Sequence, residues 1–175
     1  MVGVNTTQFA IREIGLYEPV LATAMEDSKV WTDRPLVIVV GNCGKTDQAV
    51  DEAKTAVRLG YHTGLPSLSA LKGASTEEII DHCRRVSEEV PLIGFYLQPA
   101  VGGMSLNAGF CERFAAIANV VAIKVAPVNR YRTLDVVRGV VAAGAEERVT
   151  LYTGTTITLC SISSRLLPSC GTVSL

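Results

Sequence analysis

The segment Pro35-Leu-Val-Ile-Val-Val-Gly41 is a run of apolar, mostly β-branched residues that ends in glycine. Such a run is typical of a buried strand in a parallel sheet, because both faces of that strand are covered. Similar runs recur along the chain, and their ends lie about 28 residues apart, close to the length of one βα unit. The segments that we expect to be strands are 2–4, 35–41, 62–68, 91–97, 119–125 and 148–154.

Helical patterns fill most of the spaces between these strands, at residues 47–59, 75–90, 106–118 and 131–143. Ser75 and Glu78 have the spacing of a capping box, and Gly60 and Gly144 are placed to end helices in a left-handed conformation. Repeated βα units build either an open doubly wound sheet or a (β/α)8 barrel. Six strands suffice for an open sheet, whereas a complete barrel needs about 250 residues.

The composition excludes several classes of protein. The chain has 175 residues, of which 48% are hydrophobic and 19% charged, so it can bury a substantial core. A net charge of -1 offers no general attraction for nucleic acid or for an anionic membrane surface. No apolar run approaches the roughly 20 residues of a membrane span, and the N-terminus lacks the pattern of a signal peptide. Five widely spaced cysteines suit reduced thiols, so we expect a cytoplasmic protein.

The end of the chain differs from the rest. Eleven of the 21 residues from Thr155 to Leu175 are Ser, Thr or Cys, and none is Asp or Glu. No capped helix is predicted after the last strand, which breaks the alternation of strand and helix. We therefore expect one α/β domain over residues 1–154 and an atypical tail over residues 155–175.

Lys124 is the most informative candidate for chemistry, because it is the one lysine within an apolar strand pattern. Strand ends of parallel α/β proteins point into the site at the carboxyl edge of the sheet. Burial there disfavours the ammonium form, and a neutral amine can attack a ketone to form a Schiff base. The alternative is a lysine that extends to the rim of the sheet or pairs with a carboxylate.

Other candidates lie at neighbouring strand ends. Tyr96 precedes Lys124 by one βα repeat, and neighbouring strands lie about 4.8 Å apart, so its phenol could transfer protons to the amine or its substrate. A packing role is the alternative for Tyr96. Thr6 and Thr7 follow the first apolar segment, where hydroxyls and backbone amides can hold a carboxylate. A simple turn explains Thr6 and Thr7 equally well.

Two familiar sites are not supported by the sequence. Gly41-Asn-Cys-Gly-Lys-Thr46 has Val39 where a phosphate-binding P-loop needs its first glycine, so we interpret Thr46 as a helix N-cap. The two histidines and five cysteines show no metal-binding spacing. We therefore predict no metal site. We also expect no organic cofactor, because the protonated imine of a lysine can itself withdraw electrons.

Taken together, these segments resemble the dihydrodipicolinate synthase/N-acetylneuraminate lyase family, over about residues 2–154. The family's Tyr-x-x-Pro motif resembles Tyr96 to Pro99, its imine lysine resembles Lys124, and its carboxylate-binding Gly-Thr-Thr turn resembles Asn5 to Thr7. The resemblance implies a TIM-barrel type of α/β fold that is incomplete, with about six βα units. It also implies a class I aldolase or lyase that forms a Schiff base with pyruvate or a related 2-keto acid.

The chain departs from the family pattern in five places. A tyrosine pair that the family often carries after its fourth strand is replaced near Ser69 and Ala70, and an arginine for a second carboxylate is replaced by Val101. The family's first strand and last βα unit have no counterpart. Family members often carry an acidic pair where this chain has Thr155 and Thr156, which suggests a frameshift near Gly154. An alternative coding frame without an acidic helix would contradict that hypothesis.

The leading sequence-based interpretation is therefore an aldolase or lyase in which Lys124 forms the imine, Tyr96 transfers protons, and Thr6 and Thr7 hold the keto-acid carboxylate. The expected partners are a 2-keto acid, an aldehyde and further copies of the same chain in a homo-oligomer. Two alternatives stay open: a catalytically inactive fragment of a barrel, and a small α/β ligand-binding domain.

Overall fold

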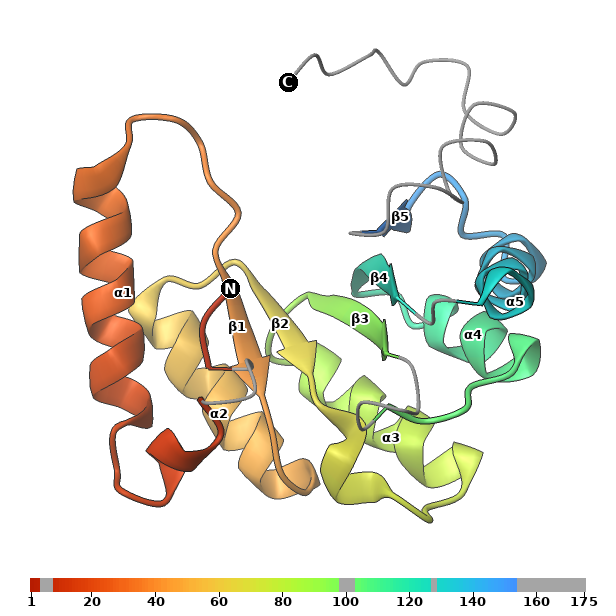
Figure 1. The fold of residues 1–175 in the computed structure, drawn as a ribbon, viewed down its shortest axis with the longest axis horizontal. Coiled ribbons are helices and arrows are strands. Elements are labelled where there is room, and N and C mark those ends of the chain that lie inside the picture. Colours follow the sequence, from red (N-terminus) through yellow and green to blue (C-terminus); the bar gives the residue numbers. More distant parts are fainter. Residues whose placement is uncertain (4–7, 98–102, 127–128, 154–175) are drawn as a thin grey trace.

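The computed structural model describes residues 1–3, 8–97, 103–126 and 129–153. Within these residues, five parallel strands form one sheet in which the spatial order follows the chain order. This arrangement confirms the predicted α/β fold and fits an incomplete barrel (Figure 1). The strands are β1 (Val39–Asn42), β2 (Thr63–Pro66), β3 (Leu92–Leu97), β4 (Val120–Ala126) and β5 (Thr150–Tyr152).

The strand predicted at residues 2–4 is reduced to one bridge in the described part of the chain, between Val2 and Val40. Val2 donates its amide to Val39 O at 3.0 Å and accepts from Gly41 N at 2.7 Å, so it lies beside β1 as an edge strand would. Val4 falls outside the described residues.

Five α-helices are described: α1 (Tyr17–Trp31), α2 (Thr46–Leu59), α3 (Thr76–Ser87), α4 (Ala108–Ala115) and α5 (Arg130–Ala142). Short 3-10 turns occupy Ala10–Arg12 and Leu68–Leu71. In Figure 1, α2 to α5 follow the outer side of the curved sheet, and α1 lies beside α2. The alternation of strand and helix therefore continues through the described part of the chain.

Local signals fix several helix ends. The predicted capping box is confirmed: Glu78 N donates to Ser75 Oγ at 3.3 Å, and Ser75 N donates to Glu78 Oε2 at 2.7 Å. Gly60 ends α2 with φ 89°, as predicted. The interpretation of Thr46 as an N-cap is wrong, because Lys45 holds that position and the Thr46 hydroxyl instead pairs with His82 Nδ1 at 3.1 Å.

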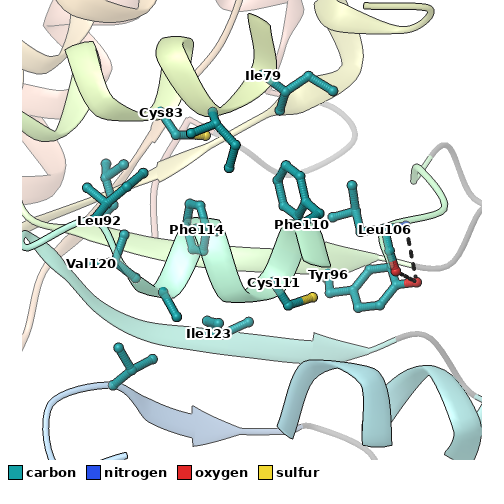
Figure 2. Packing of buried hydrophobic residues seen from close by; sticks show 14 of the residues in the cluster. Ile79, Cys83, Leu92, Tyr96, Leu106, Phe110, Cys111, Phe114, Val120 and Ile123 are labelled. Carbon is teal, nitrogen blue, oxygen red and sulfur yellow. Dashed lines mark hydrogen bonds between the residues drawn. The ribbon is translucent and has the colours of Figure 1, made fainter. Parts of the chain in front are cut away.

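The main core lies between the sheet and its outer helices. Figure 2 shows Phe110 and Phe114 of α4 packed between the strands and the Cys83 face of α3. A methyl group on Gly94 of β3 would lie 2.6 Å from Phe114, so the bare glycine lets this ring sit directly on the strand. A smaller cluster joins α1, β1 and α2, and consists of Leu21, Met25, Val40, Ala56 and Tyr61.

The other face of the sheet carries a third, smaller cluster. Its buried members are Leu65, Ile93 and Ala122, one from each of three neighbouring strands. Val39, Phe95 and Val121 pack against them and are partly exposed. This surface is the inner face of the partial barrel.

One sequence-based expectation receives no test from the fold. Residues 155–175, predicted to be an atypical tail, lie outside the described residues. The structure also shows that none of the described helices combines the length and the apolar character of a membrane span.

Candidate active site

Lys124 is the fifth of the seven residues of β4, and it lies on the inner face of the partial barrel. Its side chain is partly exposed, and its Nζ lies 4.8 Å from the centroid of the Phe95 ring on β3. An ammonium group in this position is attracted by the electron-rich face of the ring. The lysine thus sits in the carboxyl half of a central strand with one aromatic wall.

The structure does not bring Tyr96 to Lys124. The pairing of β3 with β4 begins at Leu92 with Val120, but the register shifts by one residue before Ile93, which pairs with Ala122. The shift places Phe95 beside Lys124 and Tyr96 beside Val125. Because successive residues of a strand point to opposite faces, Tyr96 lies on the helix-covered face.

Tyr96 is instead part of the main core, with 3% of its surface exposed. Its hydroxyl donates to Leu106 O at 2.9 Å and accepts from Leu106 N at 3.3 Å, as the dashed lines in Figure 2 show. These two bonds satisfy backbone groups just before α4 that would otherwise be buried without partners. Tyr96 therefore acts as a structural latch: its hydroxyl ties β3 to the backbone just before α4.

A cavity near Tyr96 has the wrong chemistry for a keto acid. Its empty volume is about 350 Å³, the open mouth included, and none of the described residues that line it is charged. A carboxylate placed there would lose its hydration without gaining a partner. The lining residues are Pro66, Leu68, Cys83, Gly94, Phe95, Tyr96, Leu106, Phe110, Phe114 and Ile123.

Thr6 and Thr7, the predicted carboxylate-binding residues, lie outside the described residues, as does Val101. Ser69 and Ala70 lie within the 3-10 turn at Leu68–Leu71 that follows β2. The position that often holds a phenol in the family is therefore occupied by short side chains in this chain.

A buried ion pair stands at the carboxyl end of β1. The Arg12 guanidinium donates to both carboxylate oxygens of Glu52 on α2, at 2.7 and 2.8 Å, and also to Gly3 O at 3.0 Å and Gly41 O at 2.9 Å. Glu52 Oε2 accepts from Cys43 N at 2.9 Å. Burial alone would lower the pKa of Arg12, but the hydrogen bond and charge of Glu52 outweigh it and raise that pKa.

Glu52 also binds the loop at residues 41–46, whose sequence partly resembles a P-loop. The Cys43 amide, which a phosphate would need, already donates to a carboxylate. A phosphate beside Glu52 would meet a like charge. The described geometry thus assigns this loop to holding α2 on β1.

The described cysteines are poor nucleophiles. Burial raises the pKa of Cys83 and Cys111 to about 12 and that of Cys43 to about 11. Because the thiolate is the reactive form, these thiols are inert near neutral pH. Among the described residues, no group of three or more His, Cys, Asp or Glu side chains could hold a metal ion.

Sequence reasoning missed two aromatic neighbours of Lys124. Phe95 pairs with Lys124 across β3 and β4, and Tyr152 pairs with it across β4 and β5. Paired residues of parallel strands point to the same face, so the three side chains form a row on the inner face. Spacing alone could have found Tyr152, because it follows Lys124 by 28 residues, the length of one βα unit in this chain.

Comparison with known proteins agrees with the fold. Residues 20–164 match the model of the dihydrodipicolinate synthetase family. Three solved structures of dihydrodipicolinate synthases are similar. One is 17% identical, with a TM-score of 0.72 over 93% of this chain and 54% of that chain, and the enzyme from Thermotoga maritima is 20% identical, with a TM-score of 0.64 over 96% and 52%. A chloride-inhibited enzyme from Acinetobacter baumannii in complex with pyruvate is 22% identical, with a TM-score of 0.66 over 87% of this chain and 50% of that chain.

Because the sequence identities are only 17–22%, the similarity to these structures supports the fold and nothing further. The chain spans about half the length of each of them, which agrees with a sheet that does not close into a barrel. The family model, in contrast, matches most of the chain. The parallel βα units, the lysine on the inner face and this match lead to one conclusion: the chain belongs to the dihydrodipicolinate synthetase family.

Proposed function

We propose that this chain carries the imine-forming lysine of a class I aldolase or lyase that acts on pyruvate or a related 2-keto acid. The observation that carries the proposal is the place of Lys124, on the inner face and in the carboxyl half of β4. Catalytic residues of barrel enzymes come from this end of the strands. The pyruvate complex of the similar Acinetobacter baumannii enzyme suggests the substrate class.

The chemistry needs no added cofactor. The Lys124 amine attacks the ketone carbon and, once water is lost, the protonated imine draws electrons from the neighbouring carbon. A carbon–carbon bond can then form to an aldehyde or break to release one. In this proposal Thr6 and Thr7 hold the keto-acid carboxylate through their hydroxyls and amides.

Tyr96 stays a predicted proton-transfer residue. Its hydroxyl would first have to leave Leu106 and reach the opposite face of the sheet, so the present geometry does not support the role. Exchange of the pyruvate methyl protons in deuterated water, measured for Tyr96→Phe, tests that prediction, since a proton-transfer role requires the exchange to slow.

The test is covalent trapping of the full chain. The protein is incubated with pyruvate and sodium borohydride, and its intact mass is measured. We expect a mass increase of one reduced keto acid that is absent from Lys124→Ala. Lys54→Ala is the matched control, because Lys54 lies on the surface of α2 with 56% of its side chain exposed. An adduct that persists in Lys124→Ala contradicts the proposal.

A second candidate function is a non-catalytic fragment that associates with other chains. The observation in its favour is the half-length coverage of the similar enzymes, together with the partly exposed apolar side chains of the inner face at Val39, Phe95 and Val121. Folded protein that traps no keto acid would support this candidate over the lyase.

For either function we propose a homo-oligomer in the cytoplasm. Burial of exposed apolar surface drives association of copies. Light scattering during size-exclusion chromatography gives the mass in solution, and a mass of one chain at all concentrations would contradict the oligomer.

A further inference from the structure

We propose that Tyr152 is the phenol that transfers protons beside Lys124. The inference rests on the proposed Schiff-base function and adds a second catalytic residue to it. Three neighbouring strands place Phe95, Lys124 and Tyr152 in one row on the inner face.

The position of Tyr152 follows from the register of the sheet. Thr150 pairs with Ala122 and Tyr152 pairs with Lys124, without a register shift between them. Because the partners of a parallel pair share a face, Tyr152 flanks Lys124 on β5 as Phe95 flanks it on β3. Tyr152 is 39% exposed, so a substrate bound to Lys124 has access to its ring.

The other four tyrosines lie away from Lys124. The chain contains five, and all lie in its described part. The hydroxyls of Tyr17, Tyr61 and Tyr96 donate to backbone carbonyls of Gly41, Leu21 and Leu106 at 2.9–3.0 Å. Tyr131 lies on α5 with 71% of its surface exposed. Tyr152 is thus the phenol that the fold places on the face of Lys124.

The protonation state of Tyr152 suits the donor role. Partial burial raises its pKa above the ordinary value of 10.0, so the phenol keeps its proton near neutral pH. A protonated phenol can act as a general acid first and, once ionised by that step, as a general base.

The proposed proton transfers balance. The Lys124 amine forms a C–N bond to the ketone carbon, and an amine proton moves to the former carbonyl oxygen. Tyr152 donates its proton to that hydroxyl, the C–O bond breaks, and water leaves the protonated imine. The Tyr152 phenolate then removes a proton from the neighbouring carbon, which gives the enamine and restores the phenol. No oxidant or reductant takes part.

The experiment separates imine formation from enamine formation. Borohydride trapping with pyruvate reports the imine, and exchange of the pyruvate methyl protons in deuterated water, followed by proton nuclear magnetic resonance, reports the enamine. We expect Tyr152→Phe to lower the exchange rate by about 100-fold or more, as is usual for loss of a general acid–base group. Tyr131→Phe is the matched control and should exchange like the unmodified chain.

Each outcome decides between defined alternatives. Unmodified protein without a borohydride adduct overturns the proposed function and this inference together. An adduct with unchanged exchange in Tyr152→Phe overturns this inference alone, as does loss of exchange in Tyr96→Phe with exchange retained in Tyr152→Phe. Circular dichroism checks the fold of each variant.

A second pair of variants covers the case in which Tyr152→Phe does not fold. Tyr152→His keeps a ring that can carry a proton, whereas Tyr152→Leu does not. Retained exchange in Tyr152→His and loss in Tyr152→Leu supports proton transfer at this position. Equal exchange rates in the two variants contradict it.

Discussion

Two regions of this partial barrel are stabilised by different interactions. At β1, helix α2 is attached through the Arg12–Glu52 pair, whose side chains are only 12% and 8% exposed. At β4, helices α4 and α5 approach each other through apolar contacts and a glycine, Gly139, with no room for a methyl group. A buried charge pair depends on both partners being present, whereas close packing depends on shape. The two regions should therefore respond differently to small substitutions.

The largest loss of stability is expected from breaking the Arg12–Glu52 ion pair. Glu52→Gln leaves the Arg12 guanidinium buried without a counter-charge and should lower the free energy of unfolding by about 3–5 kcal/mol. Urea denaturation followed by circular dichroism measures the change. Glu18→Gln, which breaks an exposed pair with Arg58, is the control and should leave stability nearly unchanged. Equal losses in both variants would show that burial of the Arg12–Glu52 pair does not matter.

A second prediction tests the close packing of α4 and α5. The added methyl of Gly139→Ala would lie 2.5 Å from Cys111 Cβ and 2.8 Å from Ala108 O, so α4 and α5 must separate. We expect a loss of about 2–3 kcal/mol in the free energy of unfolding. Among the described residues, the added methyl of Gly109→Ala on α4 meets only Asn107 Oδ1, at 3.6 Å, so this variant should be neutral or stabilised by about 0.5–1 kcal/mol. A neutral Gly139→Ala would mean that the helices separate at little cost.

The third prediction concerns the latch between β3 and the start of α4. Tyr96→Phe removes the hydroxyl that pairs with Leu106 O and N, and leaves buried backbone groups without partners. The expected loss is about 1–2 kcal/mol, measured by the same denaturation. Tyr131→Phe, on the exposed side of α5, should show no loss. Unchanged stability in Tyr96→Phe would contradict a structural role of this hydroxyl and would leave it free for proton transfer.

The smallest effect lies at the contact between α2 and α3. Burial is the main cause that lowers the pKa of His82 below its ordinary 6.5, and the charge of Arg85 adds to it. Below pH 6.5 the histidine of the unfolded chain binds a proton more readily than folded His82 does, so the free energy of unfolding should fall as the pH drops. Well above pH 6.5 both states are neutral at this residue, and the contribution of His82 to stability is complete. His82→Gln should show a shallower decline in urea titrations between pH 7.5 and pH 5. Identical declines would contradict this assignment.

Periodicity was enough to predict the repeating part of the fold. Apolar runs and helix caps repeat with each βα unit, so the sheet and α2 to α5 were anticipated from residues such as Gly60 and Ser75. Helix α1 was not predicted, because it buries only Leu21 and Met25 and so shows little apolar periodicity. Tertiary contact with α2, rather than local pattern, supports this helix.

The candidate site was harder to predict because it depends on register. A constant spacing of 28 residues between β3 and β4 would pair Tyr96 with Lys124, and Leu92 does pair with Val120 at that spacing. One extra residue before Ala122 changes the spacing to 29 and reverses the faces. Such irregularities arise from packing between strands, and motif spacing carries no record of them.

The sequential order of the strands determines the order in which the βα units should unfold. Every βα unit contacts mainly the unit before it and the unit after it, so stability is shared among nearest-neighbour interfaces, as in solenoid proteins. Amide protons of β3 and β4, which have neighbours on both sides, should exchange slowest with solvent. Those of the three-residue β5 should exchange first, and opening would then spread inward one unit at a time.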